Sequence, residues 1–271
     1  MPSPQLSIIV PVKDDDRVFR LLARLSETPE MQSCEVIVAC NGSEQQFVDR
    51  IAAALIAFPL TRTSIDSLPN PARAINGAAG VASATRILIL DSDCEPCDGY
   101  LKSILDATSA HKVMRGKITY TGTNAFSRTT AGWRQCFYDR VAEEGRLYAP
   151  NLVIDRDLFL SLGGFVESLR HAYDSEFSDR AMRAGNAAFF LPSAVVIHEC
   201  HASVRTEMKI WFAYGCGRRY RMNGTRGGDA FRDAVFGDIP WKIVLSDAGN
   251  ATYALAYLTV RTAGFLYASA I

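Results

Sequence analysis

The chain has 271 residues, 48% of them hydrophobic, and its 29 basic and 29 acidic residues give a formal net charge of zero. This length and hydrophobic content suffice for a substantial buried core and exclude a largely disordered chain. A neutral chain has no global field that would attract nucleic acid or an anionic membrane, so no nucleic-acid partner is expected.

The first hundred residues alternate short apolar runs with helical patterns. Buried strands are predicted at 6–12, 35–40 and 86–90, and helices at 18–25, after residue 43 and from residue 70. Ser43 and Gln46 form a capping box for the second helix, and Asn70 with Pro71 suits the start of the third. Alternating strands and helices predict a parallel sheet with helices on both faces.

The second half is less regular. The segment 151–165 is predicted to form a strand, a cap, a short helix and a Gly-Gly turn. Further strands are predicted at 113–122, 187–191 and 194–198, the last two separated by Pro192, and further helices at 175–185 and 206–222. Gly163 and Gly164 suit positive φ or a helix end before the first of these helices. Two glycines weaken the second helix prediction. Trp133, Tyr138 and Trp211 are predicted to be core residues or, less commonly for such a pattern, a stacking surface for a ligand.

The segment 251–271 has about the length of a membrane span, but Arg261 at its middle would be costly there. A packing helix is therefore favoured, while a membrane-surface helix, which would give peripheral contact with the inner face of a membrane, stays open.

Seven cysteines are scattered along the chain: Cys34, Cys40, Cys94, Cys97, Cys136, Cys200 and Cys216. Their odd number and irregular spacing favour a reducing compartment. The C-x-x-C at Cys94 and Cys97 has no second such pair for a zinc site, so we expect both to be bystanders. The first ten residues, MPSPQLSIIV, lack the sections of a signal peptide, which predicts a cytoplasmic protein.

An Asp-x-Asp tripeptide occurs at 14–16, 91–93 and 155–157. The first lies in a polar loop, and the third suits a helix start, where acidic residues interact well with the helix dipole. Asp91 and Asp93 instead follow a buried strand in mid-sheet, where like charges need a counter-charge. Mg²⁺ or Mn²⁺ would provide it and would stabilise a departing diphosphate. Capping of a helix near Asp98 is the alternative.

Five segments in order resemble the family 2 glycosyltransferases of GT-A fold: SIIVPVKDDD, VIVACNGSEQ, LILDSD, NLVIDRDLFLSLGGF and YDSEFSDRAMRAG. The likeness covers about residues 6–220. It implies a Rossmann-like α/β domain at 1–222, with a mixed, mostly parallel sheet flanked by helices. Residues 1–110 would form the nucleotide-sugar half and 111–222 the acceptor half, and 223–271 would be a C-terminal helical extension.

The resemblance implies an enzyme that moves a sugar from a nucleotide diphospho-sugar to an acceptor hydroxyl. The donor-binding residues that it implies are Pro11, Val12, Asn41, Arg73, Asn76, Asp91 and Ser92. The DXD motif would place Asp93 on a Mn²⁺ or Mg²⁺ ion, with Asp91 and His198 as further metal neighbours. As a lone histidine at a strand end, His198 suits a structural role as well, and His201 lies close enough to compete for the metal.

Asp174 lies at the family's catalytic-base position, counted back from Arg183, and Glu176 at its second acidic position. A carboxylate there can take the proton of the acceptor hydroxyl, although Asp174 also suits a helix cap. No second nucleophilic carboxylate is identifiable, so single displacement with inversion is expected. The family's Gln-x-x-Arg-Trp motif is absent, which favours a non-processive hexosyltransferase.

Two residues depart from the family pattern: Cys40 stands where an aspartate is usual, and Tyr173 where an acidic residue is usual. They leave open a catalytically silent sugar-nucleotide-binding protein of the same fold. A nucleotidyltransferase is a further alternative, although such an enzyme should carry a glycine-rich basic loop after its first strand, where this chain has the acidic PVKDDD.

Overall fold

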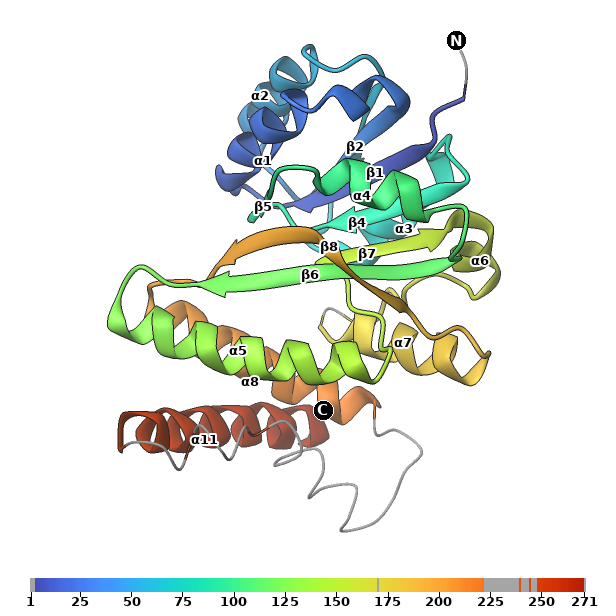
Figure 1. The fold of residues 1–271 in the computed structure, drawn as a ribbon. Coiled ribbons are helices and arrows are strands. Elements are labelled where there is room, and N and C mark those ends of the chain that lie inside the picture. The colour runs from blue at the N-terminus through green and yellow to red at the C-terminus, as the bar shows by residue number, and fades with distance from the viewer. Residues whose placement is uncertain (1–2, 170, 222–238, 240–243, 245–247, 271) are drawn as a thin grey trace. The chain divides into compact units, whose positions relative to one another are not determined.

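The computed structural model describes residues 3–169, 171–221, 239, 244 and 248–270 (Figure 1). The chain forms two compact units. The first comprises Met1–Thr119, Ala142–Ser168 and Asp174–His198, and the second comprises Tyr120–Val141, Leu169–Tyr173 and Glu199–Ile271. The predicted domain boundary between residues 222 and 223 lies outside the described residues.

The first unit is built on an eight-stranded mixed sheet in the order β3-β2-β1-β4-β7-β6-β8-β5. The strands are β1 (Leu6–Val12), β2 (Cys34–Asn41), β3 (Thr61–Asp66), β4 (Arg86–Leu90), β5 (Cys94–Pro96), β6 (Val113–Thr121), β7 (Asn151–Asp155) and β8 (Phe189–Glu199). The first four in the order are parallel, β7 is antiparallel to β4 and β6, and β5 is antiparallel to β8. Every residue of β1 and β2 is buried, as expected for strands covered on both faces.

Helices flank this sheet: α1 (Arg17–Ser26), α2 (Gln45–Leu55), α3 (Pro71–Val81), α4 (Tyr100–Ala107), α6 (Arg156–Ser161) and α7 (Tyr173–Arg183), with a short 3₁₀ turn, η1 (Pro29–Ser33). Each amphipathic helix buries one stripe, as α1 does with Val18, Leu21, Leu22 and Leu25. The predicted cap of α3 is confirmed, because the Asn70 side chain accepts a hydrogen bond from Arg73 N. The predicted fold class, a mixed α/β sheet flanked by helices, is confirmed.

Among its described residues the second unit contains most of α5 (Ala125–Glu143) and the helices α8 (Val204–Arg221) and α11 (Ala248–Ala270). An aromatic cluster forms its core, in which Trp133 is 7% and Trp211 3% exposed and Tyr253 packs against both. Tyr138 is also buried. The interpretation of these aromatic residues as core is therefore confirmed. Among the described residues, no helix is both long and apolar enough to cross a membrane.

Helices α8 and α11 pack backbone against backbone at two glycines. A Cβ atom on Gly215 would lie 2.0 Å from the Arg261 carbonyl oxygen, and one on Gly264 would lie 2.1 Å from the Phe212 carbonyl oxygen. Arg261 is buried and donates a 2.8 Å hydrogen bond from Nη1 to the Tyr257 hydroxyl. Gly215, one of the two glycines that weakened the helix prediction, is thus a packing requirement of the helix pair.

Three local predictions need correction. The capping box is wrong, because α2 begins at Gln45 and the Ser43 hydroxyl donates to the Val12 carbonyl instead. The two strands predicted around Pro192 form the single strand β8. Pro192 is exposed, and a strand tolerates proline where no N–H is needed for the ladder. Strand β3 was not predicted at all.

Candidate active site

The ends of β1, β2 and β3 meet at one edge of the sheet. Asn41 is paired in register with Asp66, and its side-chain Nδ2 donates a 3.1 Å hydrogen bond to the Val12 carbonyl oxygen. Asp66 forms an ion pair with Arg73 Nε of α3 at 2.6 Å. Of the predicted donor-binding residues, Pro11, Val12 and Asn41 therefore lie at this edge, and Arg73 is tied to it through Asp66.

Cys40, one of the two departures from the resemblance noted above, is completely buried in β2. Burial raises the pKa of its thiol to about 11, and the nearby charge of Asp14 adds to the effect. The thiol is therefore neutral at physiological pH and does not replace the missing carboxylate. The polar groups at this end of β2 are those of Asn41 and Ser43.

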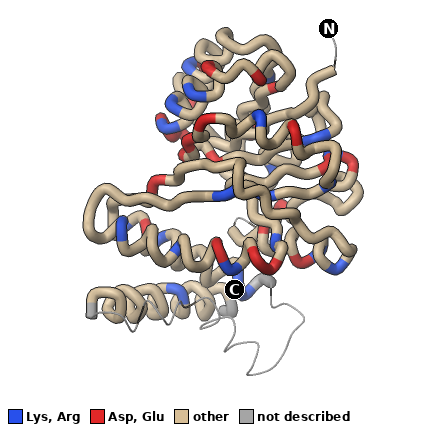
Figure 2. Tube along the Cα trace, in the orientation of Figure 1, with Lys and Arg blue, Asp and Glu red and all other residues tan. Residues whose placement is uncertain are grey.

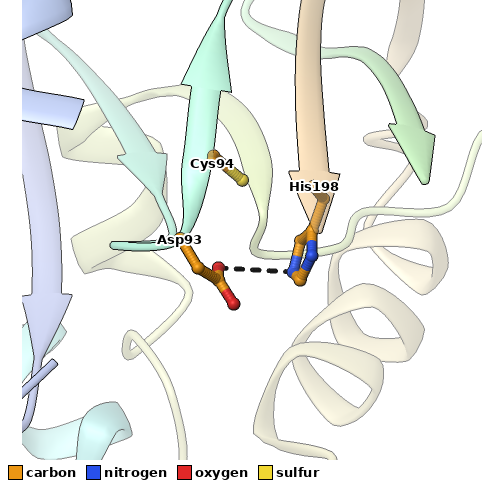
Figure 3. Close-up of side chains that lie close together, drawn as sticks. All are labelled: Asp93, Cys94 and His198. Atoms are coloured by element: carbon orange, nitrogen blue, oxygen red, sulfur yellow. Dashed lines mark ion pairs between the residues drawn. The ribbon is translucent and has the colours of Figure 1, made fainter. Parts of the chain in front are cut away.

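The acidic tripeptide at residues 91–93 forms a turn between β4 and β5, closed by a 3.1 Å hydrogen bond from Cys94 N to the Asp91 carbonyl oxygen. Asp91, Ser92 and Asp93 are partly exposed in it. Strand β5 then pairs with β8 so that Cys94 lies opposite His198. As a result the side chains of Asp93 and His198 face each other (Figure 3). The distance from His198 Nε2 to Asp93 Oδ1 is 3.3 Å. Two of the three predicted metal neighbours are thus brought into contact.

The second carboxylate oxygen of Asp93 faces Arg17, at the start of α1. Arg17 Nη1 lies 3.2 Å from Asp93 Oδ2, and the same guanidinium contacts Asp15, with Nη2 2.6 Å from Asp15 Oδ2. No sequence signal pointed to Arg17, because the contact joins a helix start to a turn that is distant in the sequence.

The residues present fit a divalent metal ion. One ligand atom each from Asp93, Cys94 and His198 lies within 4.8 Å of the others, and among the described residues this is the group with that geometry. A carboxylate oxygen and an imidazole nitrogen suit Mn²⁺. The Cys94 thiol instead contacts the Pro150 carbonyl oxygen at 3.6 Å, and burial, with the charges of Asp93 and Asp91, raises its pKa well above the ordinary value.

Asn76 binds the loop that follows α6. Its Nδ2 donates to the Phe165 carbonyl oxygen and its Oδ1 accepts from Phe165 N, both at 2.8 Å. Gly164 has a φ of +61°, and a Cβ atom there would lie 2.6 Å from Asn76 Oδ1, so the loop needs glycine at this point. The predicted donor contact of Asn76 stays a prediction, and the structure gives this amide a loop-holding role.

Asp174 lies in the first turn of α7, and its Oδ1 accepts a 2.7 Å hydrogen bond from Ser175 N. Its side chain is partly exposed, and the positive end of the helix dipole favours a carboxylate there. Glu176 is held by Arg180, whose Nη2 lies 2.6 Å from Glu176 Oε2 and 2.8 Å from the Gly164 carbonyl oxygen. Glu176 therefore positions Arg180, which binds the loop before α7, whereas Asp174 lies at the helix start.

No model of a known protein family matches the sequence, and no curated protein matches it. Solved structures do match. A mannosyltransferase from Pyrobaculum calidifontis, PcManGT, in complex with GDP-Man and Mn²⁺, has a TM-score of 0.69 and 15% identity, over 98% of this chain and 88% of that chain. TarS 1-349 from S. aureus has a TM-score of 0.59 and 15% identity, and the match covers 97% of this chain and 83% of that chain. The chain therefore has the GT-A fold of these proteins.

Proposed function

We propose that the protein is an inverting, non-processive glycosyltransferase of the family 2 type. It would move one sugar, of the hexose class, from a nucleotide diphospho-sugar to a hydroxyl group of an acceptor. The observation that carries this proposal is the Asp93–His198 contact beside the strand ends of a GT-A fold. The mannosyltransferase with this fold was solved with GDP-Man and Mn²⁺, which supports a sugar nucleotide and a divalent ion here.

The donor would lie across the carboxyl ends of β1, β2 and β4, the usual ligand site of such sheets. Val12 and Asn41 would border the nucleoside, beside the Asp66–Arg73 ion pair. Pro11 and Asn76 belong to the proposed donor site as well. Asp91 and Ser92, in the turn after β4, would approach the ribose and the sugar.

Asp93 and His198 would hold the metal ion, Mn²⁺ or Mg²⁺, with Asp91 as a further neighbour. The ion supplies positive charge that stabilises the departing diphosphate. Cys94 and Cys97 take no part in this proposal. The carboxylate and imidazole contribute one ligand atom each, which leaves coordination positions for phosphate oxygens and water.

Asp174 would act as the general base. Its position at the start of α7, where Oδ1 accepts a hydrogen bond from Ser175 N, fixes the orientation of the carboxylate. The base would take the proton of the acceptor hydroxyl as its oxygen attacks the anomeric carbon and the diphosphate leaves. Such a single displacement inverts the anomeric configuration. The acceptor is proposed only as a hydroxyl compound, met in the cytoplasm or at the inner membrane face. Contact with a membrane would use 251–271, where Leu255, Leu266 and Tyr267 of α11 are exposed.

A panel of nucleotide diphospho-sugars, tested by thermal shift with and without Mn²⁺, examines the proposal. A donor that binds the native state raises the melting temperature, by an amount that grows with its concentration over the dissociation constant. We expect one donor to raise the melting temperature of the wild type in the presence of Mn²⁺. The same donor should leave the melting temperature of Asp93→Asn unchanged. The control is Asp98→Asn, which removes an exposed carboxylate from the same region.

The outcomes separate the alternatives. Stabilisation that depends on Asp93, followed by slow release of nucleoside diphosphate, supports the transferase. Stabilisation with no turnover toward any acceptor or water favours a silent binding protein. Stabilisation by a nucleoside triphosphate with a sugar phosphate, and by no diphospho-sugar, favours a nucleotidyltransferase.

A further inference from the structure

Helix α1 presents three arginines to the acidic residues that follow β4. Arg17 lies 3.2 Å from Asp93, Arg20 lies 3.8 Å from Glu95, and Arg24 pairs with Asp98. The arginines are three and four residues apart, the spacing that puts side chains on one face of a helix. Figure 2 shows both signs of charge mixed in this part of the first unit, where α1 packs against β5.

Arg17 differs from the other two arginines in its surroundings. Its side chain is 27% exposed, compared with 51% for Arg20 and 37% for Arg24. Like Arg24, which also contacts Glu27, it has a second acidic partner: Asp15 Oδ1 accepts from Arg17 Nε at 3.0 Å, and Asp15 Oδ2 accepts from Nη2 at 2.6 Å. Asp15 thus holds two nitrogens of the planar guanidinium, while the third nitrogen reaches Asp93. The contact with Asp15 would hold the arginine in place if the contact with Asp93 were lost.

Arg17 and a metal ion would compete for the carboxylate of Asp93. The carboxylate already has a cationic neighbour at one oxygen and an imidazole at the other. A divalent cation at Asp93 must compete with the guanidinium and is repelled by it, because the region is partly buried and poorly screened. A diphosphate beside the ion removes this conflict, since its negative oxygens accept hydrogen bonds from the same guanidinium.

We propose that Arg17 is a second cationic contact of the donor diphosphate and that it couples metal binding to diphosphate binding. Without a ligand it neutralises Asp93 and weakens the binding of a lone metal ion. With a diphosphate present it turns from a competitor of the metal into a partner of the phosphate. The affinity of the site for the metal ion is then higher when diphosphate is bound, and its affinity for diphosphate is higher when the metal ion is bound. The inference rests on the proposed function, because it needs a diphosphate donor and a metal at Asp93.

The test measures binding and needs no knowledge of the sugar or the base. Mn²⁺ is titrated into wild type, Arg17→Gln and Arg20→Gln, with free Mn²⁺ followed by electron paramagnetic resonance, in the absence and presence of inorganic pyrophosphate. Arg20→Gln is the matched control, because it removes the same charge from the same helix face at a more exposed pair. Melting temperatures establish that each variant is folded, and Arg17→Lys retains the charge without the planar fork.

For Arg17→Gln we expect Mn²⁺ alone to bind about fivefold more tightly, since a competing charge is gone. Pyrophosphate in the presence of Mn²⁺ should bind about tenfold more weakly, since a charged hydrogen bond is lost. The gain in Mn²⁺ affinity that pyrophosphate produces therefore shrinks, and by linkage the effect is the same in both directions. Arg17→Lys should fall between the wild type and Arg17→Gln, and Arg20→Gln should match the wild type.

Two failures are distinguishable. If Asp93→Asn binds Mn²⁺ as well as the wild type does, the proposed metal site is wrong and the role of Arg17 falls with it. If Mn²⁺ binding depends on Asp93 but Arg17→Gln behaves like Arg20→Gln in both titrations, the proposal for Arg17 alone is overturned. Arg17 would then only attach α1 to the turn after β4.

Discussion

His198 Nε2 lies 3.3 Å from Asp93 Oδ1 because β5 and β8 pair with Cys94 opposite His198. The contact therefore depends on strand register, and a shift by one residue would turn the imidazole to the other face of the sheet. Both side chains are largely buried, with 8% of His198 and 13% of Asp93 exposed, so a metal ion there is partly shielded from water.

Replacement of the imidazole should weaken metal binding. In His198→Ala we expect the dissociation constant for Mn²⁺ to rise at least about tenfold, since the imidazole is one of the proposed ligands. The measurement is a Mn²⁺ titration followed by electron paramagnetic resonance. His201→Ala is the control, because His201 follows β8 and lies outside the group that could hold a metal. Equal Mn²⁺ affinity in His198→Ala and the wild type would remove His198 from the metal site.

Asp174→Asn should separate binding from chemistry. The amide keeps the size and the hydrogen bond from Ser175 N but accepts no proton, so we expect transfer to fall by about 10²- to 10⁴-fold with donor affinity unchanged. Turnover and the donor dissociation constant are measured in parallel. Asp157→Asn, at an exposed acid in the first turn of α6, should leave both unchanged. Turnover within a few-fold of the wild type would exclude Asp174 as the base.

The packing of α8 on α11 should tolerate no side chain at Gly215. In Gly215→Ala the new methyl group would meet the Arg261 carbonyl oxygen, and we expect the free energy of unfolding to fall by about 1–3 kcal/mol. Gly132→Ala is the control in the same unit, because an added Cβ would meet no atom within 4 Å beyond its chain neighbours and its own helix backbone. That exchange should raise stability by about 0.5–1 kcal/mol, as alanine favours helix. Urea unfolding measures both, and equal stabilities would contradict the close packing.

Glu35 should make stability depend on pH. It is fully buried, and burial raises the pKa of its carboxyl. Hydrogen bonds from Ser7 Oγ at 2.6 Å, Ser83 N at 2.8 Å and Arg62 Nε at 2.8 Å outweigh burial and bring the pKa below its ordinary value of 4.5. Because the folded pKa is the lower one, the stabilisation is complete above pH 4.5 and is lost as the pH falls through the folded pKa.

The variant Glu35→Gln, which has a neutral group of the same size, tests whether the pKa of Glu35 is lowered by folding. The difference in unfolding free energy between the wild type and Glu35→Gln, from urea unfolding at several pH values, should be largest at neutral pH. It should shrink as the pH falls below 4.5, where the wild-type carboxyl becomes neutral too. A difference that stays constant, or grows, at acid pH would contradict a lowered pKa.

The buried strands and the main helices could be predicted from the sequence because their patterns are local. The runs LSIIVPV and RILIL, for example, correspond to β1 and β4. Strand β3 was missed because it lies at the edge of the sheet and is partly exposed, so TRTSID has no apolar run. Asp66, at its end, was missed with it. A capping box at Ser43 failed for a tertiary reason, since the hydroxyl finds the Val12 carbonyl.

The candidate site was predictable only in part. The position of Asp93 after a buried strand singled it out, but His198 came from a resemblance, and its contact with Asp93 depends on the pairing of two strands distant in the sequence. The contact between Arg17 and Asp93 also depends on tertiary packing. The sequence at the start of a helix does not indicate which carboxylate its side chains will contact.

The central claim is tested most directly by the release of nucleoside diphosphate from the donor that stabilises the protein, measured with Mn²⁺ and with the metal chelated, for the wild type and Asp93→Ala. The account predicts release by the wild type in Mn²⁺, its loss on chelation and its loss in Asp93→Ala. Release that continues without metal, or at an unchanged rate in Asp93→Ala, would contradict it.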